Sequence, residues 1–278
     1  MKFHGGRLPP IPSKPRLRLA KYLAAEEVTP SSVDYLSQVE SWPMYLNDRI
    51  GDCTCAGAAH IIEAESTYGQ GRTALVSDQD VLTAYQAVSG YDPETGRNDN
   101  GAVMQNVLSY WRKSGIGGHR ILAFAEVDHD NLEQLHAALA TFGSIYLGIH
   151  CPESAMTQFN EGKPWDVVLG SRIEGGHAIN AGWYDAEAAN WKIVTWGAVQ
   201  EMTQAFWDAY VEEAWVVIAP EWLNETGRSP GGLDLQALGA DFATLTGEAN
   251  PFPLHPPPPT SSPSLLRRLW AWLNRLWR

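Results

Sequence analysis

Two residues of this chain have the type and setting needed for acyl transfer, and the first is a cysteine. Cys53 lies in the stretch NDRIGDCTCAGAAH, at the start of an alanine-rich segment that predicts a helix over residues 52–66. The N–H groups and the dipole at a helix N-terminus stabilise a thiolate by about 0.3–1 kcal/mol at an exposed site. We therefore expect Cys53 to have a depressed thiol pKa and to alkylate faster than Cys55 or Cys151. Asp52 opposes this effect, unless it serves as the helix cap.

The second residue is a histidine that could act as the base. His177 follows two glycines in GGHAINAGWY and stands at the head of an expected strand, where the glycines let another segment approach closely. A neutral imidazole within reach of a thiol gives the Cys–His pair that acyl transfer requires. His60 lies inside the first helix and is expected to pack. Without His177 as a base, Cys53 would be interpreted as an ordinary small buried residue.

No metal or cofactor is expected. Cys53 and Cys55 form a C-x-C pair, but no second Cys or His pair at ligand spacing accompanies it, so Cys55 is expected to be a core residue. Three cysteines are an odd number, which argues against a disulfide framework and favours a reducing compartment.

Helices precede strands along the chain, which predicts an α+β protein with a helical half and a sheet half. Helices are expected over about residues 52–66, 78–89, 103–113 and 131–142, with a short one near 19–26 and a weak one near 233–245. Strands are expected in the β-branched and aromatic segments SIYLGI, HAINAGWY, WKIVTWG and EAWVVIA.

Over about residues 30–220 the motifs, in this order, resemble a papain-like cysteine peptidase. Gly51-Asp52-Cys53 stands in the frame of the nucleophile helix, NGAVMQNVLSYWRKSGI resembles the family's Gly-Gly segment, and GGHAINAGWY and KIVTWG resemble its histidine strand and its tryptophan strand. The resemblance implies a two-lobed fold, in which the helical lobe carries the Cys53 helix, the antiparallel β lobe carries His177, and a cleft lies between them. The style of the sequence looks like a bacteriophage-encoded branch.

Two positions depart from the family's pattern. The resemblance places Asn47, six residues before Cys53, at the position of the oxyanion-hole glutamine, and its amide is shorter by one methylene. It places Val194 at the position of the asparagine that orients the imidazole, and valine cannot form that hydrogen bond. Thr195 could do so only in a different strand register, because neighbours on a strand face opposite ways. Trp196 matches the tryptophan that shields the pair.

Two functions follow from the resemblance. The first is a cysteine peptidase or related thiol hydrolase, in which Cys53, His177 and Asn47 act on a peptide or protein substrate. The alternative is a papain-fold structural or interaction protein with weakened chemistry, in a phage particle for example. The first 29 residues form a basic, proline-punctuated arm, which is too short for the family's helical inhibitory prosegment.

The charge distribution bears on partners. Out of a net charge of −12, residues 1–21 carry +6 and residues 249–278 carry +4, which leaves −22 for the middle of the chain. An acidic body argues against nucleic acid as the main ligand. No secretory signal is recognisable, so a cytoplasmic location is expected, in the host cell or a virion if the chain is phage-encoded.

The C-terminal region is expected to lie outside the core. Residues 221–250 read as an extension, 251–263 as a proline-rich linker, and 264–278 as a basic amphipathic helix rich in leucine and tryptophan. We expect residues 251–278 to be dispensable for the core. The helix could dock on protein or on a membrane surface, and self-association is a further expectation.

Overall fold

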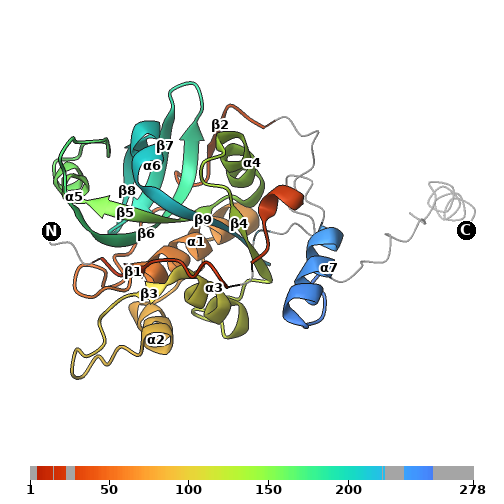
Figure 1. The fold of residues 1–278 in the computed structure, drawn as a ribbon. Helices are drawn as coiled ribbons and strands as arrows, with labels where there is room; N and C mark the ends of the chain where they lie inside the picture. The colour runs from red at the N-terminus through yellow and green to blue at the C-terminus, as the bar shows by residue number, and fades with distance from the viewer. Residues whose placement is uncertain (1–4, 15, 23–28, 221, 223–234, 253–278) are drawn as a thin grey trace, which may run out of the picture.

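The computed structural model describes residues 5–14, 16–22, 29–220, 222 and 235–252 of the chain (Figure 1). The terminal helix expected over 264–278, and the linker beyond residue 252, lie outside the described residues. Within the described part, no helix is both long enough and apolar enough to span a membrane.

Among the described residues, the helical half consists of three helices near the positions expected from sequence. They are α1 (Cys53–Gln70), α2 (Asp78–Ser89) and α3 (Met104–Lys113). Ser77 and Asp80 form a capping box that starts α2, in which each side chain accepts a hydrogen bond from the other residue's backbone. Gly71 and Gly90 end α1 and α2 in the left-handed conformation.

The other half is an antiparallel sheet in the order β4-β9-β5-β6-β7-β8, with β2 paired to β6. Its strands are β2 (Ser32–Asp34), β4 (Ala123–Val127), β5 (Ile145–Pro152), β6 (Ile173–Asp185), β7 (Asn190–Thr195), β8 (Ala198–Thr203) and β9 (Val211–Ile218). Four of them were expected, and β2, β4 and β8 were not. Three further helices belong to this half, α4 (Leu132–Phe142), α5 (Glu153–Asn160) and α6 (Gln204–Tyr210).

Side-chain alternation along the central strands gives the molecule two cores. On β5, Ile145 and Leu147 join the core of the β lobe, whereas Tyr146 between them joins the core under α1, α2 and α3. On β9, Val216 likewise joins the core of the β lobe, and its neighbour Trp215 joins the core under the three helices. Because successive strand residues face opposite sides, one sheet packs both lobes, and the expected two-lobed α+β fold is confirmed (Figure 1).

Segments outside residues 30–220 also pack on this domain. A short strand, β1 (Arg7–Leu8), pairs in parallel with β3 (Ala102–Val103) and contacts β6. The short helix expected near 19–26 is a 3-10 turn, η1 (Leu19–Lys21), and residues 23–28 lie outside the described part.

The C-terminal extension contributes to the core as well. It contains α7 (Leu235–Thr246), where a weak helix was expected, and its Leu238 and Phe242 are buried in the core of the β lobe. Phe252 is buried there too, so the expectation that the whole of residues 251–278 is dispensable for the core is wrong at its N-terminal boundary.

Candidate active site

Cys53 is the first residue of α1 and is buried, with 1% of its surface exposed. Burial raises the pKa of its thiol to about 12, and hydrogen bonds from the backbone of Ala178 and of Gly6 oppose that rise only in part. The expected depressed pKa is therefore wrong for this conformation, because desolvation of the thiolate outweighs the helix terminus. Asp52 occupies the N-cap position but makes no side-chain capping bond.

His177 lies on β6 and is held on two sides. Its Nε2 atom is 2.8 Å from Oγ1 of Thr195, and its ring stacks on Trp196 at 4.7 Å between centroids. Burial, followed by the positive charge of Arg7, lowers the pKa of His177 to about 3, so the imidazole is neutral near pH 7. Since Ala178 follows His177 and bonds to the thiol of Cys53, the two residues come from opposite lobes to one place.

Thr195 forms a hydrogen bond with His177 that the valine at position 194 could not form. The β6–β7 ladder ends at the pair Asn180–Val194, and Trp196 then adopts a left-handed conformation with φ +46°. Residues paired across a sheet face the same side, so Val194 shares the side of Asn180, whereas Thr195, one residue on, shares the opposite side with His177. The hydroxyl of Thr195, and not the side chain of Val194, therefore contacts the ring of His177.

Asn47 lies beside Cys53, and its amide is already bonded. Its Nδ2 atom donates to Oδ1 of Asp52 at 3.1 Å and to the carbonyl oxygen of Ile50 at 3.4 Å. Asp52 is fully buried, and burial raises its pKa well above the ordinary value. The amide would have to turn from Asp52 to reach a substrate oxygen.

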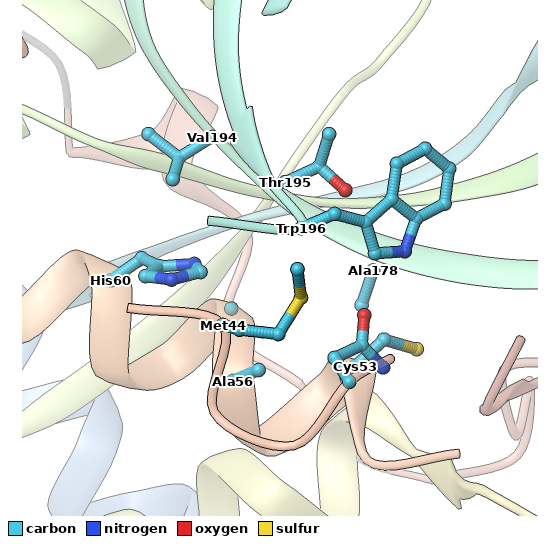
Figure 2. Close-up of a pocket in the computed structure, with 10 residues that line it drawn as sticks. Met44, Cys53, Ala56, His60, Ala178, Val194, Thr195 and Trp196 are labelled. Atoms are coloured by element: carbon cyan, nitrogen blue, oxygen red, sulfur yellow. The ribbon is translucent and has the colours of Figure 1, made fainter. Parts of the chain in front are cut away.

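A small cavity lies between α1 and the end of β7 (Figure 2). Its volume is about 10 Å³, which is room for one water molecule. Its walls are Met44, Asn47, Cys53, Ala56, Gly57, His60, Ala178, Val194, Thr195 and Trp196. His60 packs there as expected, with Nε2 at 2.8 Å from the carbonyl oxygen of Pro43 and a pKa that burial lowers to about 4.

The first described residues of the chain run across this site. The N–H of Ala102 donates to the carbonyl oxygen of Gly6 at 2.7 Å. A Cβ added to Gly6 would lie 1.7 Å from the carbonyl oxygen of Gly51, and one added to Gly101 would lie 2.1 Å from that of Gly6. Real Cβ atoms do not approach backbone so closely, so the strand fits only because these positions lack side chains.

The same strand passes the histidine side of the site. A Cβ on Gly176, the residue before His177, would lie 2.2 Å from the carbonyl oxygen of Arg7. Sequence reasoning missed the role of Gly6 and Arg7 altogether. The sequence did contain a signal for this contact. Gly51, Gly101 and Gly176 lie close in sequence to Cys53, Ala102 and His177, and together they leave room for an extended backbone.

The remaining thiols and the acidic groups offer little to a metal. Cys55 and Cys151 are buried and free. Among the residues that the structure describes, no group of three or more His, Cys, Asp or Glu side chains could hold a metal ion.

The fold is that of papain-like cysteine proteases. Xylellain, a cysteine protease from Xylella fastidiosa, superimposes with a TM-score of 0.55 at 17% identity, over 78% of this chain and 96% of that one. Digestive procathepsin L 3 of Tenebrio molitor superimposes with a TM-score of 0.53 at 12% identity, over 77% of this chain and 75% of that one. Procathepsin B S9 from Trypanosoma congolense has a TM-score of 0.53 at 12% identity, over 78% of this chain and 86% of that one. No protein-family model and no curated protein sequence matches the chain.

Proposed function

We propose that this chain is a papain-like thiol hydrolase that cleaves peptide bonds with Cys53 as nucleophile and His177 as general base. The observation that carries the proposal is the hydrogen bond between Nε2 of His177 and Oγ1 of Thr195, together with the stacking of the ring on Trp196. A base oriented by a third group, next to a nucleophile at a helix N-terminus, is the arrangement of nucleophilic catalysis. The likeness in fold to cysteine proteases supports a peptide or protein as substrate.

The reaction would proceed in two steps. With Nε2–H donating to Thr195, the other ring nitrogen, Nδ1, takes the thiol proton while sulfur attacks the carbonyl carbon of the substrate. The C–N bond then breaks, and the imidazolium returns the proton to the leaving amine. Water, deprotonated by the same nitrogen, hydrolyses the thioester and restores the thiol.

The oxyanion would be stabilised by two donors near the sulfur, the backbone N–H of Cys53 and the amide of Asn47. Because Asn47 now donates to Asp52, this role requires a rotation of the amide when substrate enters. Losing one such donor typically costs about 2.7–4 kcal/mol of barrier, so the rotation matters for rate.

The test is hydrolysis of fluorescently labelled casein by the full chain and by its Gly6→Ala variant, in which the segment over the thiol is expelled. Cys53→Ala should abolish turnover in both, whereas Cys151→Ala, at a buried thiol outside the cavity, should retain it. No turnover by any of these proteins would favour the alternative, a papain-fold interaction protein with lost chemistry.

Several finer expectations stay predictions. They are the phage-encoded branch, the cytoplasmic location, self-association, and docking of the terminal helix on protein or membrane.

A further inference from the structure

The side chain of Arg7 is buried in an acidic pocket of the β lobe. Its Nη1 atom is 2.8 Å from Oε1 of Glu213, and its Nη2 atom pairs with Oε2 of Glu212. The side chains of Arg7 and Glu213 are only 1% and 2% exposed. Glu213 is held in place from the other side by Nε1–H of Trp215, at 2.9 Å.

Two features of the sheet create this pocket. Glu212 and Glu213 are neighbours on β9 and would normally face opposite ways, but the pairing of β5 with β9 shifts register between Gly148 and Ile149. This irregularity lets both carboxylates reach one guanidinium. Gly148 supplies the space, because a Cβ there would lie 2.7 Å from Cδ of Arg7.

The pocket is unfavourable without a cation in it. Two carboxylates this close repel each other, and breaking a buried pair by removing one partner typically leaves an uncompensated charge. Burial already raises the pKa of Glu213, while the hydrogen bonds from Trp215 and Arg7 lower it. His150 also lies near Glu212, with Nε2 at 3.3 Å from Oε2, whereas Arg7 is the only ion-pair partner of Glu213 among the described residues. A side chain that replaces Arg7 is therefore selected for positive charge mainly by Glu213.

The backbone next to Arg7 lies where a substrate would have to lie. Gly6 bonds to the thiol of Cys53 through its backbone, and the carbonyl oxygen of Arg7 passes Gly176, beside His177. Arg7 and its pocket are thus one residue away from the nucleophile. Gly6 itself is confined by Gly51 and Gly101, which admit no side chain at that position.

We propose that this pocket selects an arginine or lysine side chain of the peptide substrate, with glycine as the neighbouring residue at Cys53, and that Gly6-Arg7 occupies it as a built-in ligand. The proposal rests on the proposed function, because it takes the groove at Cys53 as the substrate site. Entry of substrate then requires the N-terminal strand to leave.

The test measures peptide binding to a full chain that carries Gly6→Ala, which expels the strand, and Cys53→Ala, which prevents turnover. Fluorescein-labelled peptides Gly-Gly-Arg-Leu, Gly-Gly-Met-Leu and Gly-Gly-Glu-Leu are titrated by anisotropy. The arginine peptide should bind at least tenfold more tightly than the methionine peptide, and the glutamate peptide should not bind. Adding Glu213→Gln should reduce the arginine preference at least fivefold.

The matched control is Gly5→Ala with Cys53→Ala, since Gly5 is exposed and its substitution should leave the strand in place and the peptides unbound. Arg7→Gln is the second way to open the groove if Gly6→Ala does not fold.

Equal affinity for the three peptides, or no binding to either opened variant, overturns the proposal. Catalysis plays no part in this readout, so selective binding by a protein that cleaves no casein would defeat only the proposed function. Casein cleavage without arginine selectivity would defeat only this inference.

Discussion

The residue that contacts the ring of His177 in the candidate site is a threonine, Thr195. A threonine hydroxyl offers one donor and two acceptor positions, so it can accept the proton of Nε2 on His177 as an asparagine oxygen would. It is shorter than the amide, but its Oγ1 atom lies 2.8 Å from Nε2 of His177. In the proposed mechanism, Thr195 is therefore the third group, which holds the ring of His177 in place.

Replacing Thr195 tests this role. Thr195→Val keeps the shape but removes the hydrogen bond, so kcat for casein should fall about tenfold, which corresponds to about 1.4 kcal/mol. KM should change little, because the residue orients the base and does not hold the substrate. Thr195→Ser should retain most of the activity, and equal kcat values for the valine and serine variants would contradict the orienting role.

The neighbouring position should respond in the opposite way. On the sequence comparison alone, Val194→Asn should restore an orienting amide and raise turnover. In the structure Val194 is fully buried, so a polar side chain there should cost about 1–3 kcal/mol of unfolding free energy and should not raise kcat. Urea unfolding and casein hydrolysis on the same preparation measure both effects, and a gain in kcat would mean that the asparagine reaches His177.

At the scale of elements, α1 carries Cys53, the proposed nucleophile, and also a buried histidine two turns later. His60 packs between Trp42 and Tyr45, and Nε2 bonds to the carbonyl oxygen of Pro43. Its folded-state pKa of about 4 lies below the ordinary value of 6.5. The unfolded chain thus binds the proton first, so this contribution to stability is complete above pH 6.5 and is lost as pH falls toward 4.

This gives a prediction about acid stability. Each pH unit between the two pKa values is worth about 1.4 kcal/mol, so neutral burial of His60 should account for roughly 3 kcal/mol of acid destabilisation between pH 6.5 and 4. His60→Gln keeps a donor for Pro43 and should reduce the slope of the unfolding free energy against pH in that window by about 1.4 kcal/mol per pH unit. His177, whose pKa burial also lowers, keeps its own share of the slope. A slope that does not change in the variant, measured by urea unfolding, would contradict the neutral burial of His60.

The elements near the site follow from the sequence to different degrees. Capping at Ser77 and terminal glycines allow α2 to be predicted to the residue, and β-branched runs identify β5, β6 and β9. The strands β2 and β4 are short, and a short strand has no local signal that outweighs its partner in the sheet. The Arg7 pocket was beyond sequence reasoning, because it depends on a register shift between two strands and on a segment more than two hundred residues away.

At the scale of the whole molecule, both ends of the described chain close onto the papain-like domain. Lys21 and Tyr22 each bond to Asp241 of α7 at 2.6 Å, and Arg112 pairs with Glu248. These contacts join the N-terminal arm, the helical lobe and the C-terminal extension. The acidic middle of the chain therefore holds at least part of the basic arm by direct ion pairs.

The extension should accordingly contribute to stability. Phe252 is 5% exposed in the core of the β lobe, so Phe252→Ala should lower the unfolding free energy by about 3–5 kcal/mol. Leu169→Ala, at a leucine that is 94% exposed, is the matched control and should have no measurable effect. Calorimetry of the full chain distinguishes the two, and equal melting temperatures would place Phe252 outside the cooperative unit.

The central claim, that Cys53 is a nucleophile activated by His177, is tested most directly by its alkylation rate as a function of pH. Iodoacetamide modification of the three cysteines is mapped by mass spectrometry from pH 5 to 9, in the wild type and in Gly6→Ala. Cys53 should react slowly in the wild type, because the thiol is buried. In the opened variant it should react faster than Cys55 and Cys151, with a midpoint well below the ordinary thiol value of about 8.5, and His177→Ala should restore that ordinary value. A midpoint near 8.5 with and without His177 would contradict the account.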